Sequence, residues 1–175
     1  MTHVARVAIL GAESTGKSTL APALAARYRT VWVPEYLREF VETKSRTPRE
    51  EEQFSIASTQ VTREEQMVST ADGFVFCDTT PLMTAIYSQF YWGRVDQALE
   101  DLASSRTYDF TIVTAPDGPW TADGLQRESE AVRQAIHEML LIALERSATA
   151  YLLVAGDLTD RLRQVARHLP IATSG

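Results

Sequence analysis

Apolar residues follow two patterns along this chain: short unbroken runs, and longer segments in which they recur every three or four positions. Unbroken runs are typical of strands in a parallel sheet covered on both faces, and the longer spacing is typical of amphipathic helices. The runs predict strands at residues 4–10, 31–33, 74–78, 109–115 and 151–154. The spaced segments predict helices at residues 17–28, 35–40, 48–70, 82–91, 94–104, 128–146 and 156–169. This alternation predicts an α/β fold, a five-stranded parallel sheet with helices on both faces.

The third predicted helix carries Phe54, Ala57, Val61 and Val68 at helical spacing, and we expect these residues to face the core. Gln60 lies beside this face and is interpreted as an ordinary amide on the helix surface. The fourth predicted helix is rich in aromatic residues, which at helical spacing usually belong to a core. Some of its rings could also stack on a flat substrate.

The first predicted strand leads into Gly-Ala-Glu-Ser-Thr-Gly-Lys-Ser, which matches the phosphate-loop pattern G-x-x-x-x-G-K-[ST] between a strand and a helix. Such a loop points backbone N–H groups at an anion, and the helix N-terminus adds its positive dipole end. The lysine brings a full charge to the phosphates, and the serine hydroxyl can bind Mg²⁺. A glycine-rich turn that binds nothing is the alternative. The residues predicted to bind the nucleotide here are Gly11, Glu13, Ser14, Thr15, Gly16, Lys17, Ser18 and Thr19.

Two carboxylates follow predicted strands and are therefore expected at the carboxyl edge of the sheet, where α/β proteins bind ligands. Asp78 ends the third strand, in the Walker-B arrangement that holds Mg²⁺ or its waters. Alternatively, Asp78 or Thr79 caps the following helix. Glu35 follows the second strand, where it could face a substrate or stabilise a helix N-terminus.

A long loop follows the fourth strand, and residues 116–133 are predicted to form a lid over the site. Phosphoryl transfer needs cationic donors, and Arg127 and Arg133 are the candidates, although Arg133 could equally be a solvated helix residue. In the last helix, Arg161 could stack on an adenine ring or be an ordinary surface charge. Cys77 is expected to be a small core residue.

The composition narrows the class of protein. The chain has 175 residues, of which 45% are hydrophobic, which predicts one domain spanning residues 1–175. A net charge of −6 disfavours sequence-independent binding to nucleic acid. The single cysteine excludes an internal disulfide and fits a reducing cytoplasm. We expect neither a secretion signal nor a membrane span. The expected partner is a small-molecule substrate, and oligomeric state is left open.

Several segments together resemble one P-loop kinase family. These are the phosphate loop with Glu-Ser-Thr between its glycines, Glu-Tyr-Leu-Arg-Glu after the second strand, Asp-Thr after the third, and Pro-Trp-Thr-Ala-Asp-Gly-Leu after the fourth. In this order and spacing they resemble the ribosylnicotinamide kinase domain of the NadR-type NAD-salvage proteins, over nearly the whole chain. The resemblance implies a three-layer P-loop NTPase fold of the nucleoside-kinase type. It also implies transfer of the γ-phosphate of ATP to the 5′-hydroxyl of nicotinamide riboside, which gives nicotinamide mononucleotide.

The chain departs from the family in three ways, one of which is that the segment beyond Asp-Gly-Leu is shorter than in the family. NadR-type proteins carry an adenylyltransferase domain before the kinase, whereas this sequence starts at the kinase strand, so that activity is expected to be absent. The family has an arginine directly after Asp-Gly-Leu, whereas this chain has Gln126 there and Arg127 one position later.

The resemblance assigns roles to individual residues. The cofactors are ATP and Mg²⁺, with the metal between Ser18 and Asp78. The acceptor hydroxyl is positioned by a carboxylate, for which Glu35 is the first choice and Asp78 the second. The substrate contacts implied are Glu35, Tyr36, Arg38, Asp78, Trp120 and Asp123, and the catalytic residues are Lys17, Glu35, Asp78 and Arg127.

Alternative functions remain at this point. One is a P-loop kinase of another small nucleoside or metabolite, and another is a non-catalytic ATP-binding sensor. A GTP-dependent switch is disfavoured because neither N-K-x-D nor D-x-x-G occurs in the chain. A mechanical AAA-type ATPase is disfavoured because the chain leaves little room for an additional helical domain.

Overall fold

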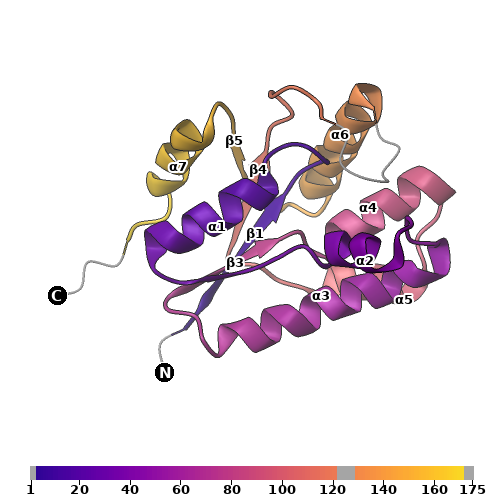
Figure 1. Cartoon of the computed structure of the whole chain (residues 1–175), viewed down its shortest axis with the longest axis horizontal. Coiled ribbons are helices and arrows are strands. Elements are labelled where there is room, and N and C mark those ends of the chain that lie inside the picture. The colour runs from indigo at the N-terminus through magenta and orange to yellow at the C-terminus, as the bar shows by residue number, and fades with distance from the viewer. Residues whose placement is uncertain (1–2, 122–128, 172–175) are drawn as a thin grey trace.

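A computed structural model describes residues 3–121 and 129–171. A five-stranded sheet in the order β2-β3-β1-β4-β5 runs through the molecule, and every adjacent pair of strands is parallel (Figure 1). The strands are β1 (Ala5–Leu10), β2 (Val31–Val33), β3 (Phe74–Asp78), β4 (Phe110–Thr114) and β5 (Leu152–Val154). The α/β fold and all five predicted strands are therefore confirmed.

The helices also follow the predicted order. They are α1 (Lys17–Tyr28), α2 (Tyr36–Lys44), α3 (Gln53–Val68), α4 (Pro81–Trp92), α5 (Gln97–Ser105), α6 (Glu130–Arg146) and α7 (Leu158–Ala166). A short 3-10 turn, η1 (Glu50–Glu52), leads into α3, so the helix predicted from residue 48 begins as this tighter turn. None of the helices in the described ranges is long and apolar enough to cross a membrane.

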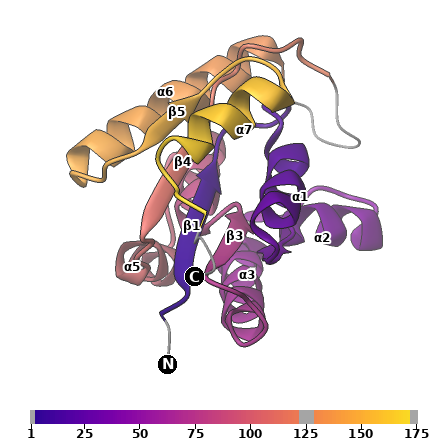
Figure 2. The same ribbon diagram turned by 90° about the vertical axis from the view of Figure 1, so that its left-hand side faces the viewer.

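The helices form a layer on each face of the sheet (Figures 1 and 2). Alternate residues of β1 point to opposite faces, because side chains alternate along a strand. Val7 and Ile9 pack with α1 and α7, whereas Ala8 and Leu10 pack with α4 and α6. A smaller apolar cluster joins the inner side of α3 to β2 and β3. Both faces of the central strand are thus buried, which explains its unbroken apolar run.

The buried face of α3 includes Ala57 from the predicted apolar stripe, but most of its other residues are polar. Its buried residues are Gln53, Ile56, Ala57, Gln60 and Glu64. Phe54, which was expected in the core, is 40% exposed. The expectation fails for Phe54 because polar side chains with partners elsewhere in the fold occupy most of the inner face, whereas Ala57 is buried and Val68 packs against the core as expected. Glu64, for example, is fully buried and bonds to Arg106 and Tyr108.

A crevice opens at the carboxyl edge of the sheet, between the ends of β1 and β3. The chain leaves β1 toward α1 on one face and leaves β3 toward α4 on the other. Neighbouring parallel strands whose connections diverge in this way create a binding crevice. The paired register of Ile9 with Asp78 places the end of β3 directly beside the start of the phosphate loop.

Candidate active site

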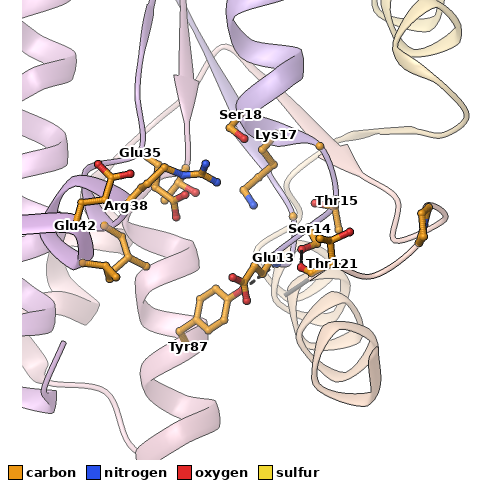
Figure 3. Close-up of a pocket in the computed structure, with 16 residues that line it drawn as sticks. Glu13, Ser14, Thr15, Lys17, Ser18, Glu35, Arg38, Glu42, Tyr87 and Thr121 are labelled. Atoms are coloured by element: carbon orange, nitrogen blue, oxygen red, sulfur yellow. Dashed lines mark hydrogen bonds between the residues drawn. The ribbon is translucent and has the colours of Figure 1, made fainter. Parts of the chain in front are cut away.

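A cavity of about 380 Å³ lies at this edge of the sheet. Figure 3 shows Lys17 and Ser18 on one side of it, Glu35, Arg38 and Glu42 on another, and Tyr87 with Glu13 below. The residues that line it are Gly11, Glu13, Ser14, Thr15, Gly16, Lys17, Ser18, Glu35, Leu37, Arg38, Val41, Glu42, Thr79, Tyr87, Pro119 and Thr121. The phosphate loop therefore shares one cavity with the segment that follows β2.

The phosphate loop has the compact shape that its glycines permit. A Cβ atom on Gly11 would collide with the hydroxyl oxygens of Thr114 and Thr15, so only glycine fits there. Those two hydroxyls lie 2.7 Å apart, and the Thr15 hydroxyl also donates to the Ala12 carbonyl at 2.7 Å. Gly16 is the N-cap of α1 with φ of +88°, a left-handed conformation that favours glycine.

Lys17 lies across this loop. Its ammonium group donates a hydrogen bond to the carbonyl oxygen of Ala12 at 3.0 Å, and the residue is largely buried. The loop thus carries a fixed positive charge on the side that lines the cavity. Seven of the eight residues predicted to bind the nucleotide line the cavity, whereas Thr19 is exposed outside it.

Glu35 is the N-cap residue of α2, but in the described chain its carboxylate accepts no capping hydrogen bond from that helix. Instead the residue lines the cavity, with Arg38 and Glu42 beyond it on the same helix. Figure 3 shows these three side chains across the cavity from Lys17. Glu42 was not predicted, although its spacing of seven residues from Glu35 places both on one helix face.

Asp78 lies at the end of β3 and is 2% exposed. Burial, reinforced by the charge of Glu35, raises the pKa of Asp78 to about 7, and the charges of Lys17 and Arg38 oppose this rise. Among the residues that the structure describes, none donates a hydrogen bond to its buried Oδ1 atom. Thr80 occupies the N-cap of α4, so neither Asp78 nor Thr79 fills that position. A buried carboxylate oxygen that receives no hydrogen bond can serve as a ligand for a hard cation such as Mg²⁺.

Gln60 belongs to the site, contrary to the prediction that it is a surface amide. It is 3% exposed, and its side-chain oxygen accepts a hydrogen bond from the backbone N–H of Tyr36 at 2.7 Å. Its amide nitrogen donates to the carbonyl oxygens of Pro34 at 3.2 Å and Asp78 at 3.4 Å. The only signal in the sequence is its position three residues after Ala57, on the buried face of α3.

Two arginines contact the outer side of the phosphate loop. Arg133 is buried rather than solvated and donates to the carbonyl oxygens of Ser14 and Gly118. Arg161 is also buried, and its guanidinium group donates to the carbonyl of Thr15 and to Asp117. The surface-charge alternatives for both residues are therefore wrong. Adenine stacking by Arg161 stays a prediction.

Some predicted substrate residues are not among those that line the cavity. The ring of Tyr36 lies 4.7 Å from the guanidinium carbon of Arg63. Trp120 is partly buried between Pro119 and Thr121, which do line the cavity. Asp78 is also not among the lining residues, and all of the predicted substrate contacts stay predictions. Asp123, Gln126 and Arg127 lie outside the described residues.

Comparisons with known proteins agree with this architecture. The family model described as AAA domain (AAA_28) matches residues 6–161. The trifunctional NAD biosynthesis/regulator protein NadR of Salmonella typhimurium is 31% identical over 145 residues, and the match covers 81% of this chain and 35% of the relative. NadR of Escherichia coli gives the same values. The chain thus spans about a third of the length of these curated relatives.

Solved structures share the fold. A NadR protein in complex with NAD and AMP-PNP superposes with a TM-score of 0.79 at 19% identity, covering 98% of this chain and 51% of that one. A NadR protein in complex with NR gives 0.78 at 20% identity, with coverages of 98% and 54%. Deoxyadenosine kinase from M. mycoides gives 0.62 at 13% identity, with coverages of 93% and 96%. Because the family model covers most of its length, the chain belongs to the P-loop family described as AAA domain, and the NadR proteins are among its relatives.

Proposed function

We propose that this chain is an ATP-dependent kinase that phosphorylates the 5′-hydroxyl of nicotinamide riboside. The observation that carries the proposal is that the phosphate loop, Lys17 and Glu35 line one and the same cavity, with Lys17 and Glu35 on different sides of it (Figure 3). A kinase needs this arrangement because the γ-phosphate and the acceptor hydroxyl must meet in line. The identity to NadR proteins and the fold shared with a NadR protein in complex with NR support the choice of acceptor.

On the donor side, the loop N–H groups and Lys17 would bind the triphosphate. Ser18, which lines the cavity, and the Oδ1 atom of Asp78, which receives no hydrogen bond from the described residues, are both hard oxygen ligands. They would therefore suit a Mg²⁺ ion. In the described part of the chain, no cluster of three or more His, Cys, Asp or Glu side chains could hold a metal. Mg²⁺ bound by one carboxylate would therefore take its other ligands from phosphate oxygens and water, as is usual for this ion. When bound, the ion would neutralise charge on the phosphates.

On the acceptor side, Glu35 would orient the 5′-hydroxyl. In the transfer, the bond between the γ-phosphorus and the β–γ bridging oxygen breaks, and a bond forms between that phosphorus and the 5′-oxygen. The hydroxyl proton passes to the Glu35 carboxylate, and ADP leaves with the bridging electron pair. Because phosphoryl transfer is largely dissociative, positioning and late proton acceptance are the main tasks of this carboxylate.

The side of the cavity formed by Glu35, Arg38 and Glu42, the acceptor wall, has a net negative charge that favours a cationic substrate. Glu35 and Glu42 line the cavity across from Lys17, with Arg38 as the cation on the same helix, and Glu13 of the phosphate loop adds a third carboxylate to the lining. The nicotinamide ring of the riboside carries a fixed positive charge, which this acidic wall would attract. The aromatic ring of Tyr87 also lines the cavity and could contribute a cation–π contact. Two further parts belong to the proposal. Residues 116–133 form a lid over the site, with Arg127 as its cationic donor. The whole chain, residues 1–175, forms one kinase domain.

Coupled detection of ADP release with Mg-ATP tests this function. The acceptor panel is nicotinamide riboside, nicotinic acid riboside, adenosine, cytidine and no acceptor. We expect release that depends on nicotinamide riboside. Release that depends on another nucleoside would support a kinase with a different acceptor. Equal release without acceptor would indicate an ATPase, and ATP binding without release would indicate a sensor.

A further inference from the structure

We propose that Arg133 and Arg161 are positioning residues that hold the phosphate loop in its phosphate-binding conformation from the outside. They do so by binding the carbonyl oxygens of two consecutive loop residues, Ser14 and Thr15. The inference rests on the proposed function only in that the loop binds phosphate. It requires no particular acceptor.

Arg161 projects from α7 to the outer surface of the loop. Its Nη1 donates to the Thr15 carbonyl, its Nη2 to the Ala115 carbonyl at 3.1 Å and to Asp117 at 2.7 Å, and its Nε to the Gly156 carbonyl at 3.0 Å. A Cβ atom on Gly16 would lie 2.9 Å from Nη1, so the guanidinium rests against the bare backbone of that glycine. All three nitrogens are therefore engaged, and most of the bonds go to backbone carbonyls.

Arg133 reaches the same loop from α6, on the other face of the sheet. Its Nη1 donates to the Ser14 carbonyl at 3.1 Å and its Nη2 to the Gly118 carbonyl at 2.7 Å. Glu130, one turn earlier on α6, lies 2.6 Å from Nη2 and partly neutralises the charge. Arg133 is only 2% exposed, and burying a guanidinium is costly unless it is bonded.

These bonds matter because of the geometry of the peptide unit. In a trans peptide the C=O and the following N–H point in opposite directions. Drawing the carbonyls of Ser14 and Thr15 outward therefore turns the N–H groups of Thr15 and Gly16 inward, toward the cavity. Ser14 itself has φ of +55°, which is unusual for a residue with a side chain, so this conformation needs support.

The two arginines also join the loop to the segment after β4. Arg161 bonds to Thr15 and Asp117, and Arg133 bonds to Ser14 and Gly118. A third link runs from the Ser14 hydroxyl to the Thr121 carbonyl at 2.6 Å. Two consecutive residues of the phosphate loop, Ser14 and Thr15, are therefore linked to the segment that follows β4. The two guanidinium charges add a positive field behind the N–H donors.

The test measures binding of phosphate chains, not turnover, by calorimetric titration of Arg133→Met and Arg161→Met with Mg-AMP-PNP and with Mg-tripolyphosphate. Tripolyphosphate has no base, so it separates loop positioning from adenine stacking. We expect both variants to bind both ligands about tenfold more weakly, as loss of a charge-assisted hydrogen bond predicts. Methylguanidinium should restore part of the affinity of Arg161→Ala, because it can refill the vacated site.

Arg6→Met is the matched control. Arg6 is a partly buried arginine at the opposite end of β1, bonded to Glu65, and its loss should leave both affinities unchanged. Unchanged tripolyphosphate affinity in folded Arg133→Met and Arg161→Met would overturn the proposal. If Arg161→Met weakens binding of AMP-PNP but not of tripolyphosphate, the proposal is overturned for Arg161, and adenine stacking explains its role. If Arg6→Met loses as much affinity for the two ligands, the effect is one of general destabilisation, and the proposal is overturned as well.

Circular dichroism and thermal unfolding verify that each variant is folded. If removal of a buried arginine prevents folding, Asp117→Asn and Glu130→Gln loosen the same two side chains from partly exposed positions. We expect each to weaken tripolyphosphate binding by about threefold, the scale of a weakened ion pair. Unchanged affinity in both would contradict the proposal. Because no acceptor is used, a wrong acceptor assignment would leave these results intact.

Discussion

The side-chain oxygen of Gln60 accepts a hydrogen bond from the backbone N–H of Tyr36 at 2.7 Å, directly after Glu35. The same side chain donates to the carbonyl oxygens of Pro34 and Asp78. One buried amide on α3 therefore joins the segment after β2 to the end of β3. These two segments carry the carboxylates that we propose to face the acceptor hydroxyl and the metal, so their relative placement depends on Gln60.

Replacing Gln60 with leucine should disturb this placement. The change leaves the Tyr36 N–H and two carbonyls without a buried partner, which costs about 1–3 kcal/mol of unfolding free energy. We expect kcat to fall about tenfold or more while KM for ATP changes little, because the phosphate loop is untouched. Urea unfolding and steady-state kinetics measure the two effects. Gln66→Leu, at an exposed position of the same helix, is the control. Wild-type kcat in Gln60→Leu would show that the bridge does not position Glu35.

Lys17→Met should abolish turnover while the fold is kept. Methionine preserves the buried stem of the side chain but removes the only lysine charge that lines the cavity. Removing one preorganised charge that stabilises a transition state costs about 100-fold or more in kcat. The chain offers a matched control in Lys44→Met, because Lys44 is its other lysine and lies exposed at the end of α2. Turnover at the wild-type rate in Lys17→Met would refute the phosphate-loop assignment.

Glu35→Gln separates the two carboxylates that could accept the proton. Glutamine keeps the size and a hydrogen-bond acceptor but cannot take the hydroxyl proton, so kcat should fall about 100-fold or more. The ATP affinity should change much less. Asp78→Asn should instead weaken binding of Mg-ATP, because it removes the proposed metal ligand. Kinetics and calorimetry on both variants check these expectations. An unchanged kcat in Glu35→Gln would move the proton-accepting role to Asp78.

Glu42→Lys tests whether the acidic wall selects a cationic acceptor. The substitution puts a positive charge on the wall that we propose attracts the cationic nicotinamide ring. The KM for nicotinamide riboside should therefore rise about tenfold, the effect of one ion pair in a partly solvated site. The KM for ATP should stay unchanged, and Glu42→Gln should give an intermediate value. Glu138→Lys on α6, a residue that does not line the cavity, controls for the change in net charge. Identical KM values in wild type and Glu42→Lys would show that this carboxylate does not contact the acceptor.

The features that could be predicted from sequence are those whose causes are local. The phosphate loop needs Gly11 and Gly16 for reasons within its own turn, and strand ends are marked by the residues themselves. The positions of Glu35 and Asp78 at one edge then follow from parallel topology alone. For this reason both the fold and the core of the candidate site followed from pattern and spacing.

The features that could not be predicted depend on partners far along the chain. Gln60 is buried because it bonds to the carbonyl of Pro34, just after β2, and to that of Asp78 in β3. Glu64 is buried because Arg106 and Tyr108 donate hydrogen bonds to it. Arg133 likewise contacts Ser14, which lies 119 positions away. An analysis that sorts the residues of a helix only into apolar and polar assigns all of these polar residues to the surface. Only the assembled fold shows that buried polar groups find their partners.

We predict that the ion pair between Arg46 and Glu52, which joins the loop after α2 to η1, stabilises the fold only while Glu52 is ionised. The two terminal guanidinium nitrogens of Arg46 donate to the carboxylate of Glu52, at 2.7 and 2.8 Å, and the backbone N–H of Arg49 donates to it at 2.8 Å. Hydrogen bonding by Arg46, then by the Arg49 backbone, lowers the pKa of Glu52 from 4.5 to about 2. Because the folded-state pKa is depressed, this contribution is complete above pH 4.5 and is lost as the pH falls toward about 2.

Glu52→Gln removes this titration. Its thermal midpoint at neutral pH should be lower than that of the wild type, and the difference should shrink as the pH falls from 4.5 toward about 2. Other acids titrate in the same range, so the difference between the two proteins, not the absolute midpoint, reports Glu52. Glu51→Gln is the control, since Glu51 is more exposed and lies 3.9 Å from Arg49. A difference that stays constant down to pH 2 would show that the ion pair with Arg46 does not form in solution.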